Sequence, residues 1–220
     1  MKELFRAREL SKNYGGRAIL RGIGCSLRDG EIAGLIGANG AGKTTLLRIL
    51  LGFLRASSGC VEWRSTATSL PPDTVGHFGG AHTLPARMRA RTWVRLVSGG
   101  RARCDDRRPI ASLSRGSRQL LGLSALLVRT DLEGVFLDEP WEGLDPDGAR
   151  WLSETLRRRK EDGCAFLVSS HRLHDLAGLC DRYWFLLDGR LVSRDSGEIS
   201  RAPVSGEDLL RTFDRIRCAT

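Results

Sequence analysis

Two segments near the N-terminus show regular alternation of apolar and polar positions. They are residues 4–10 and 18–27, and the alternation is typical of strands with one buried face. The turn-forming run Asn13-Tyr14-Gly15-Gly16 lies between them. The pattern therefore predicts two antiparallel strands joined by a hairpin.

From residue 31 onward, short apolar runs alternate with longer amphipathic segments. Residues 31–36 form an apolar run between Asp29-Gly30 and a glycine-rich stretch, as in a buried strand that leads into a loop. Helices are predicted at residues 44–54, 117–127, 147–160 and 173–179, and strands at residues 134–137, 165–169 and on both sides of Asp188-Gly189. Strands that alternate with helices favour a mainly parallel sheet covered on both faces.

The pattern weakens between residues 71 and 112, where prolines and glycines interrupt it and one helix is predicted, at residues 86–97. We interpret this segment as a small inserted lobe or an ordered loop region. The tail from Ser205 predicts a capped amphipathic helix. Its apolar residues Leu209, Leu210, Phe213 and Ile216 are expected on one side.

The composition is that of a globular protein. The chain has 220 residues, 41% hydrophobic and 28% charged, which suits one domain with a sizeable core. No apolar stretch approaches the roughly 20 residues that cross a bilayer, and residues 1–10 lack the continuous apolar core of a secretion signal. A cytosolic protein is expected.

Cysteine spacing and charge narrow the classes of partner. The six cysteines are scattered, with no CxxC pair, so we interpret them as reduced thiols, most of them in the core, rather than metal ligands. Lysine and arginine total 35 against 26 aspartate and glutamate, a formal net charge of +9. This favours anionic partners such as nucleotide, nucleic acid or acidic lipid, although arginine runs are also typical of a solvated exterior.

The candidate chemistry begins directly after the strand at residues 31–36. Gly37-Ala38-Asn39-Gly40-Ala41-Gly42-Lys43-Thr44 fits the pattern G-x-x-x-x-G-K-[ST], between a predicted strand and a predicted helix. Glycines allow successive backbone N–H groups to surround a phosphate, and the helix N-terminus adds partial positive charge. Lys43 is expected to reach the outer phosphates and Thr44 to ligate magnesium.

A nucleotide-hydrolysing loop also needs a carboxylate on a neighbouring strand to hold the metal. The run Val135-Phe136-Leu137-Asp138-Glu139 supplies one at the end of an apolar strand. Asp138 could bind magnesium through water, and Glu139 is placed to polarise the attacking water as a general base. Such a pair alone could also begin a loop or cap a helix; after a phosphate-binding loop, it predicts hydrolysis.

Further motifs resemble those of ABC ATPases, in the family's order, over about residues 2–195. Residues 113–119, Leu-Ser-Arg-Gly-Ser-Arg-Gln, resemble the signature loop, usually written LSGGQ. Residues 142–146 resemble the D-loop, and Ser169-Ser170-His171 resembles the segment that carries the switch histidine. Tyr14 matches the aromatic that stacks on adenine. The motifs resemble most the branch whose partners are ABC-2-type exporter permeases.

The resemblance implies an α/β fold of the P-loop NTPase (RecA-like) type: a mainly parallel core sheet, an N-terminal antiparallel β subdomain and a shortened helical subdomain. It implies a single ABC ATPase domain over residues 1–220. Its core would comprise residues 1–79 and 113–200, its reduced helical subdomain residues 80–112, and its C-terminal helix residues 201–220.

The resemblance also implies an ATPase, converting ATP and water to ADP and phosphate, that powers a separately encoded exporter permease from the cytoplasmic face of the cell membrane. Two copies would pack head to tail and close over ATP and Mg²⁺. Glu139 and His171 would be catalytic, and Thr44 and Asp138 would hold the metal. The residues implied to contact ATP are Tyr14, Gly37, Asn39, Gly40, Ala41, Gly42, Lys43, Thr44, Thr45, Ser114, Gly116, Asp138 and Asp145.

Some features depart from the family pattern. Arg115 and Ser117 replace a glycine and the terminal glutamine of the signature loop, and ATP contact is expected to survive. No glutamine lies between Arg64 and Arg118, so the Q-loop glutamine expected after a strand near residues 75–78 is absent, with Gly80 at its approximate position and His82 nearby. The following segment is short by one or two helices. Coupling to the permease is therefore altered, and we interpret Trp141 as interface packing.

Two other classes stay open. The charge suggests a soluble ABC ATPase that acts on ribosomes or DNA, but the chain has neither a second ATPase domain nor a long coiled coil, so nucleic acid is not the expected partner. The missing glutamine and Arg115 suggest a regulatory module without turnover, against which Asp138, Glu139 and His171 argue. A comparison of ATPase rates with Glu139→Gln would separate these classes.

Overall fold

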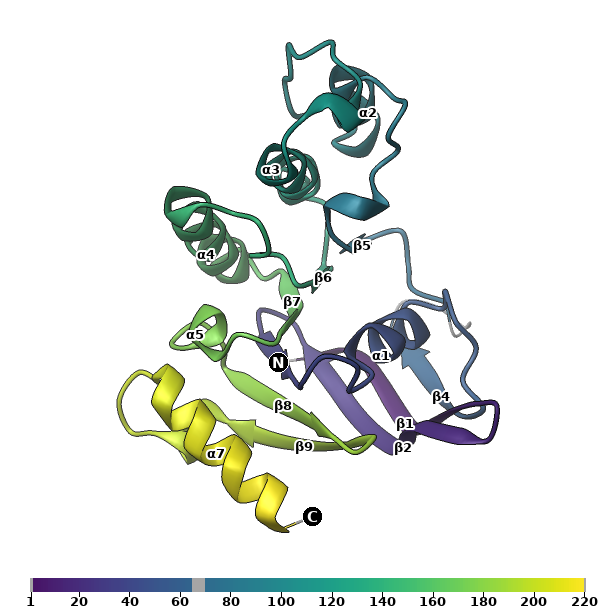
Figure 1. Ribbon diagram of the computed structural model, residues 1–220, viewed down its shortest axis with the longest axis vertical. Coiled ribbons are helices and arrows are strands. Elements are labelled where there is room, and N and C mark those ends of the chain that lie inside the picture. The colour runs from purple at the N-terminus through teal and green to yellow at the C-terminus, as the bar shows by residue number, and fades with distance from the viewer. Residues whose placement is uncertain (1, 65–69, 220) are drawn as a thin grey trace.

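The computed structural model describes residues 2–64 and 70–219, and a six-stranded sheet forms its centre (Figure 1). Its strand order is β5-β6-β7-β3-β8-β9, and every neighbouring pair is parallel except β8 and β9. The strands are β3 (Ile32–Ile36), β5 (Val75–Phe78), β6 (Gly134–Asp138), β7 (Ala165–Ser170), β8 (Arg182–Leu187) and β9 (Arg190–Asp195). The mainly parallel sheet predicted from the alternating pattern is confirmed.

A separate antiparallel sheet has the order β2-β1-β4, with β1 (Glu3–Tyr14), β2 (Arg17–Arg28) and β4 (Ser58–Trp63). The predicted hairpin is present, turning at Gly15 and Gly16, which both have positive φ. The strand β4 was not predicted. Only Val61 and Trp63 of its six residues are buried, so its sequence carries little of the alternation that marks a strand.

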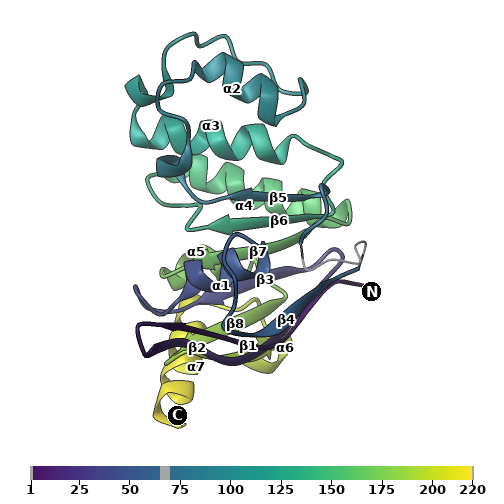
Figure 2. The same ribbon diagram turned by 90° about the vertical axis from the view of Figure 1, so that its right-hand side faces the viewer.

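Four helices cover one face of the central sheet, and a fifth helix together with the antiparallel sheet covers the other (Figure 1 and Figure 2). One face packs against α3 (Arg115–Leu127), α4 (Pro146–Glu161), α5 (Leu173–Leu176) and α7 (Gly206–Ala219), and the other against α1 (Lys43–Leu50) and the antiparallel sheet. The strand β7 shows the division: Phe166 and Val168 belong to the first apolar cluster, and Ala165 and Leu167 to the second. Because both faces are buried, the central strands are mostly apolar, with polar residues such as Asp138 and Ser169 at their ends.

The lobe at residues 81–112 extends beyond the β5 edge of the sheet, at the top of Figure 1. It holds the 3₁₀ turns η1 (Ala81–Thr83) and η2 (Ile110–Ser112) and the helix α2 (Ala90–Val97). The predicted helix began four residues earlier. Residues 86–89 instead form a turn that ends in a bridge between Arg89 and Pro109. The Ala111 N–H bonds to the Ala86 carbonyl, and the Ile110 N–H to the Met88 carbonyl.

Other predicted boundaries were also wrong. Helix α1 ends at Leu50 rather than at residue 54, because Gly52 adopts φ +72° and its N–H bonds to the Ile49 carbonyl. Helix α5 is a single turn. Residues 201–205 precede the C-terminal helix, and Leu210, predicted on its apolar side, is 49% exposed.

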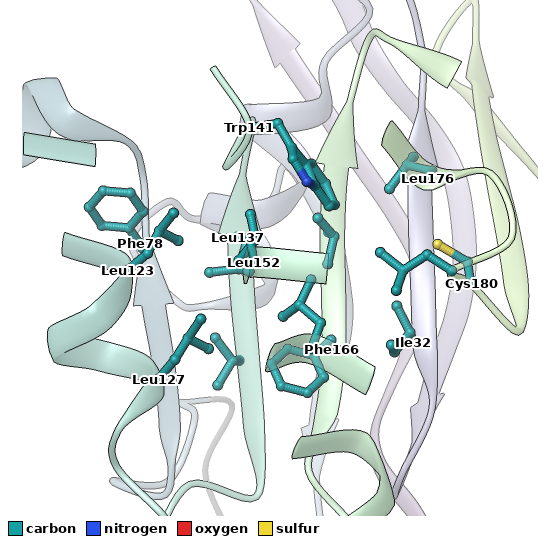
Figure 3. Packing of buried hydrophobic residues seen from close by; sticks show 14 of the residues in the cluster. Ile32, Phe78, Leu123, Leu127, Leu137, Trp141, Leu152, Phe166, Leu176 and Cys180 are labelled. Carbon is teal, nitrogen blue, oxygen red and sulfur yellow. The ribbon is translucent and has the colours of Figure 1, made fainter. Parts of the chain in front are cut away.

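The interpretation of Trp141 as interface packing needs correction. Its side chain is 3% exposed and lies within this chain's own core, near Leu152 and Leu137 (Figure 3). The cysteines were expected mostly in the core; Cys164 and Cys180 are buried, Cys25 and Cys104 half-buried, and Cys60 and Cys218 exposed. Among the described residues, no helix is both long and apolar enough to cross a bilayer.

Candidate nucleotide-binding and catalytic site

The phosphate-binding loop joins β3 to α1, as the sequence predicted. Gly42 precedes the helix with φ +104°, and a Cβ there would lie 3.0 Å from Ile19 Cγ2 and 3.2 Å from Leu20 Cδ2. Only glycine therefore suits this position, because the hairpin strand β2 packs directly against the loop. The first N–H groups of α1, at Lys43, Thr44 and Thr45, have no partner within the helix and can face an anion.

The Lys43 side chain lies along the inside of this loop. It is 7% exposed, and its ammonium donates hydrogen bonds to the carbonyl oxygens of Gly37 (2.8 Å) and Ala38 (3.4 Å). The same nitrogen lies 3.3 Å from Oε1 of Glu139. A buried ammonium among loop carbonyls is positioned to exchange these contacts for phosphate oxygens.

Asp138 joins the loop to two strands of the central sheet. Its Oδ2 accepts a hydrogen bond from the Thr44 hydroxyl (2.6 Å), and its Oδ1 accepts one from the Ser169 hydroxyl (2.5 Å). These residues come from α1, β6 and β7, which the strand order places side by side. The hydroxyl and carboxylate oxygens of Thr44 and Asp138 are the hard donors that Mg²⁺ prefers, so this pair fits the metal that the sequence predicted.

Glu139 follows directly and has φ +49°, uncommon for a residue with a side chain. Its N–H donates to the carbonyl oxygen (3.2 Å) and the hydroxyl oxygen (3.1 Å) of Ser169. Its Oε2 lies 2.9 Å from His171 Nδ1 and accepts the His171 N–H at 3.3 Å. The structure thus brings Lys43, Glu139 and His171 together from three separate parts of the sequence.

The remaining predicted residues lie outside this cluster. Tyr14 is 50% exposed near the tip of the β1–β2 hairpin, with Lys12 Nζ 5.0 Å from its ring centre. Ser114 caps α3 and accepts the Ser117 N–H (3.1 Å), while Asp145 caps α4 and accepts the Gly148 N–H (2.7 Å). Gly116 lies against Gly143, whose carbonyl oxygen would be 2.7 Å from a Cβ. These residues therefore do not contact Lys43 in this chain.

A cavity of about 470 Å³ opens beside the carboxylates. Its lining includes Thr44, Asp138 and Glu139 on one side and Gly80, Arg115 and Gln119 on the other. Arg115 forms an ion pair with Glu142. On the neighbouring strand β5, burial lowers the pKa of His77, and the Asp138 carboxylate partly opposes this shift.

Sequence reasoning missed two polar side chains at this site. Ser169, which is fully buried, holds both Asp138 and the Glu139 backbone. Gln119, which is 2% exposed, bonds to Ala81 and Pro140. Gln119 is the only glutamine of the chain, and that rarity beside the signature loop was the available signal; Ser169 gave none beyond its place at a strand end.

The sequence matches the family model described as ABC transporter over residues 20–142, more than half of its length. The chain belongs to the ABC transporter family. The uncharacterized ABC transporter ATP-binding protein YhcH of Bacillus subtilis is 32% identical, over 87% of this chain and 70% of that protein. The lantibiotic transport ATP-binding protein SrtF of Streptococcus pyogenes is 28% identical, over 86% of this chain and 89% of that protein.

Exporter-type relatives of this ABC ATP-binding protein also include the fluoroquinolones export ATP-binding protein of Mycobacterium tuberculosis, 31% identical over 88% of this chain and 71% of that protein. Among solved structures, an ATP-binding subunit of an ABC transporter aligns with a TM-score of 0.82 at 21% identity, over 96% of this chain and 99% of that chain. An ATP-binding cassette of an ABC transporter in its ADP conformation aligns with a TM-score of 0.72 at 19% identity, over 97% of this chain and 96% of that chain. These likenesses confirm the expected fold class.

Proposed function

We propose that this chain is the ATP-hydrolysing subunit of an ABC exporter and acts on a separate membrane permease from the cytoplasmic face. The observation that carries the proposal is the contact of Lys43 and His171 with the same Glu139 carboxylate, beside the Thr44–Asp138 pair. Phosphate binding, metal binding and a general base are thereby assembled at one edge of the sheet. The exporter-type relatives support the direction of transport.

In this proposal, ATP lies over the loop at residues 37–45, where Lys43 and the N–H groups of α1 bind its outer phosphates. Thr44 and Asp138 hold Mg²⁺, which when bound neutralises charge on those phosphates. Glu139 accepts a proton from the attacking water. His171 holds the Glu139 carboxylate through its ring and its backbone N–H, so that the base keeps its orientation.

A second copy completes the site in this proposal. Ser114 and Gly116 stand at the N-terminus of α3, away from Lys43 of their own chain, and would close over nucleotide bound to the other copy together with Asp145. Tyr14, on the hairpin whose strand β2 packs against Gly42, would stack on adenine. We assign residues 80–112 to a reduced helical subdomain within one ABC ATPase domain. The gene beside this one is expected to encode about six apolar segments of 20 residues.

The test is the steady-state rate of phosphate release by the wild type and by Glu139→Gln. Removal of a general base is expected to lower kcat by about 100-fold or more. Glu133→Gln is the matched control, because Glu133 directly precedes the same strand, β6, at its opposite end and pairs on the surface with Arg64. Equal, near-zero rates for the wild type and Glu139→Gln would contradict hydrolysis, and equal measurable rates would contradict Glu139 as the base.

The paired arrangement is tested by sizing Glu139→Gln with ATP and Mg²⁺. Because ATP is not consumed, the variant is expected to elute as a dimer and to return to a monomer when nucleotide is removed. A monomer at all nucleotide concentrations would contradict closure by a second copy.

A further inference from the structure

Gln119 makes an unusual set of contacts for a helix residue. Its side chain is 2% exposed and makes its contacts with backbone groups of two other segments. The amide oxygen accepts the Ala81 N–H (2.9 Å). The amide nitrogen donates to the Pro140 carbonyl at 2.8 Å, with the Glu139 carbonyl at 3.4 Å. A buried amide used in both directions fixes the distance between those two segments.

The two segments have different roles. Glu139 and Pro140 form the turn after β6, so their backbone sets where the Glu139 carboxylate points. Ala81 begins η1, directly after Gly80, whose φ of +97° marks the point where the chain leaves the sheet for the lobe. Gln119 itself lies in the second turn of α3, whose N-terminus carries Ser114 and Gly116. It therefore contacts both the base-bearing turn and the entry to the lobe.

We propose that Gln119 is a positioning residue for Glu139, which it holds from α3 through the backbone of the Glu139–Pro140 turn. Displacement of α3 at its N-terminus would move the Pro140 carbonyl, and with it the backbone that aims the Glu139 carboxylate toward Lys43 and His171. The proposal rests on the hydrolysis proposed above and adds that the base is held from the helix carrying the signature loop.

Few other residues of the chain carry a side-chain amide. No other glutamine exists in the sequence, and Asn39, in the phosphate-binding loop, and Asn13, in the hairpin strand, are its only asparagines. Apart from Gln119, the carboxylates and Thr44, the cavity is lined by Gly79, Gly80, Ala81, His82, Arg115 and Arg118. None of these six residues has a side-chain amide, which could accept a hydrogen bond from the Ala81 N–H and donate one to the Pro140 carbonyl at once.

The experiment compares Gln119→Leu with the wild type and with Ser98→Ala. Leucine is close to glutamine in size but makes none of the hydrogen bonds. Ser98 is fully buried in the same lobe and accepts the Ala102 N–H (3.1 Å), so Ser98→Ala also removes one buried lobe hydrogen bond, away from the carboxylates. Both variants are expected to lower the thermal midpoint, but only Gln119→Leu lowers kcat, by about tenfold.

KM for ATP and the affinity for a fluorescent ATP analogue are expected to stay at the wild-type values in Gln119→Leu, because Lys43 and the loop N–H groups are untouched. In the Glu139→Gln background, adding Gln119→Leu is expected to lower the rate no further, since there is no base left to position. A tenfold further loss in that background, or a wild-type kcat in Gln119→Leu, would overturn the proposal.

Gln119→Asn is the second variant in case leucine prevents folding. It keeps both polar groups but is one methylene shorter, so it cannot span Ala81 and Pro140, and a reduced kcat with unchanged KM is again expected. A wild-type kcat for the asparagine variant would overturn the proposal. The outcomes also separate the two proposals: equal, near-zero rates for the wild type and Glu139→Gln count against hydrolysis, whereas a rate lost only with Glu139 counts against Gln119.

Discussion

Gly122 lies in the middle of α3, where alanine would ordinarily stabilise a helix by about 1 kcal/mol. The neighbouring strand β5 reverses that expectation. A Cβ at position 122 would lie 2.2 Å from Cε2 and 2.5 Å from Cζ of Phe78. Carbon atoms pack at about 3.5 Å or more, and Phe78 is 4% exposed, so its ring has no route to solvent.

The two effects can be compared in size. Overpacking of a filled core costs about 1–3 kcal/mol, and an overlap this deep belongs at the upper end. After subtraction of the propensity gain, Gly122→Ala is expected to lower the free energy of unfolding by about 2 kcal/mol. For a chain of this length, that corresponds to a fall of about 4–8 °C in the thermal midpoint.

Chemical denaturation of Gly122→Ala and of Gly197→Ala measures the difference. Gly197 lies in the short helix α6 (Ser196–Ile199), and nothing is within 4 Å of its Cβ position, so alanine there is expected to change stability by less than about 0.5 kcal/mol. Phe78→Leu removes the two closest ring atoms, Cε2 and Cζ. The double variant Phe78→Leu/Gly122→Ala should therefore lose less free energy of unfolding than the sum of the losses in the two single variants. Gly122→Ala at wild-type stability, or strict additivity, would refute the reasoning.

Two further predictions concern the surface and the C-terminal helix. A thiol reagent is expected to label the exposed Cys60 and Cys218 rapidly in the native protein, and Cys164 and Cys180 only on unfolding, because burial raises the pKa of both buried thiols, that of Cys164 to about 11. The double variant Cys60→Ser/Cys218→Ser should therefore lack the fast phase of labelling. A fast phase that persisted in this variant would contradict the burial of the other thiols. Ser205 and Asp208 bond reciprocally at the start of α7. Ser205→Ala should therefore lower the free energy of unfolding by about 1 kcal/mol and speed amide hydrogen exchange in the first turn of the helix. Unchanged exchange in that turn would mean that the cap does not hold the helix.

Local pattern was sufficient for the elements whose burial follows from their own sequence. The central strands are mostly apolar because both faces of the sheet are covered, and the glycines of the loop at residues 37–44 follow a spacing that is recognisable without the fold. Ends were harder to predict. Leu54 continues the apolar pattern of α1 because it packs against the second core cluster, yet the helix has already ended at Leu50. The spacing of apolar residues indicates which residues are buried, and buried residues continue beyond the last hydrogen bond of the helix.

The sequence placed Lys43, Thr44, Asp138, Glu139 and His171 in one site because each follows or begins a regular element at the same edge of the sheet. Side chains that act through the backbone of another segment left no such pattern. Ser169 and Gln119 contact N–H and carbonyl groups, and a backbone group is the same at every residue. Their partners could be identified only from the folded chain.

Contacts along α3 connect its position to the hydrolysis proposed for Glu139. Within three turns the helix meets Gly143 at Gly116, the Glu139–Pro140 turn and Ala81 at Gln119, and Phe78 at Gly122. All of these contacts leave little room. At Gly116 and Gly122, backbone or ring atoms lie closer than a Cβ would tolerate, and the buried Gln119 amide bonds to both segments. A helix held this closely cannot shift at its N-terminus without moving the Glu139–Pro140 turn. The segment that resembles the signature loop is therefore linked through α3 to the turn that carries Glu139.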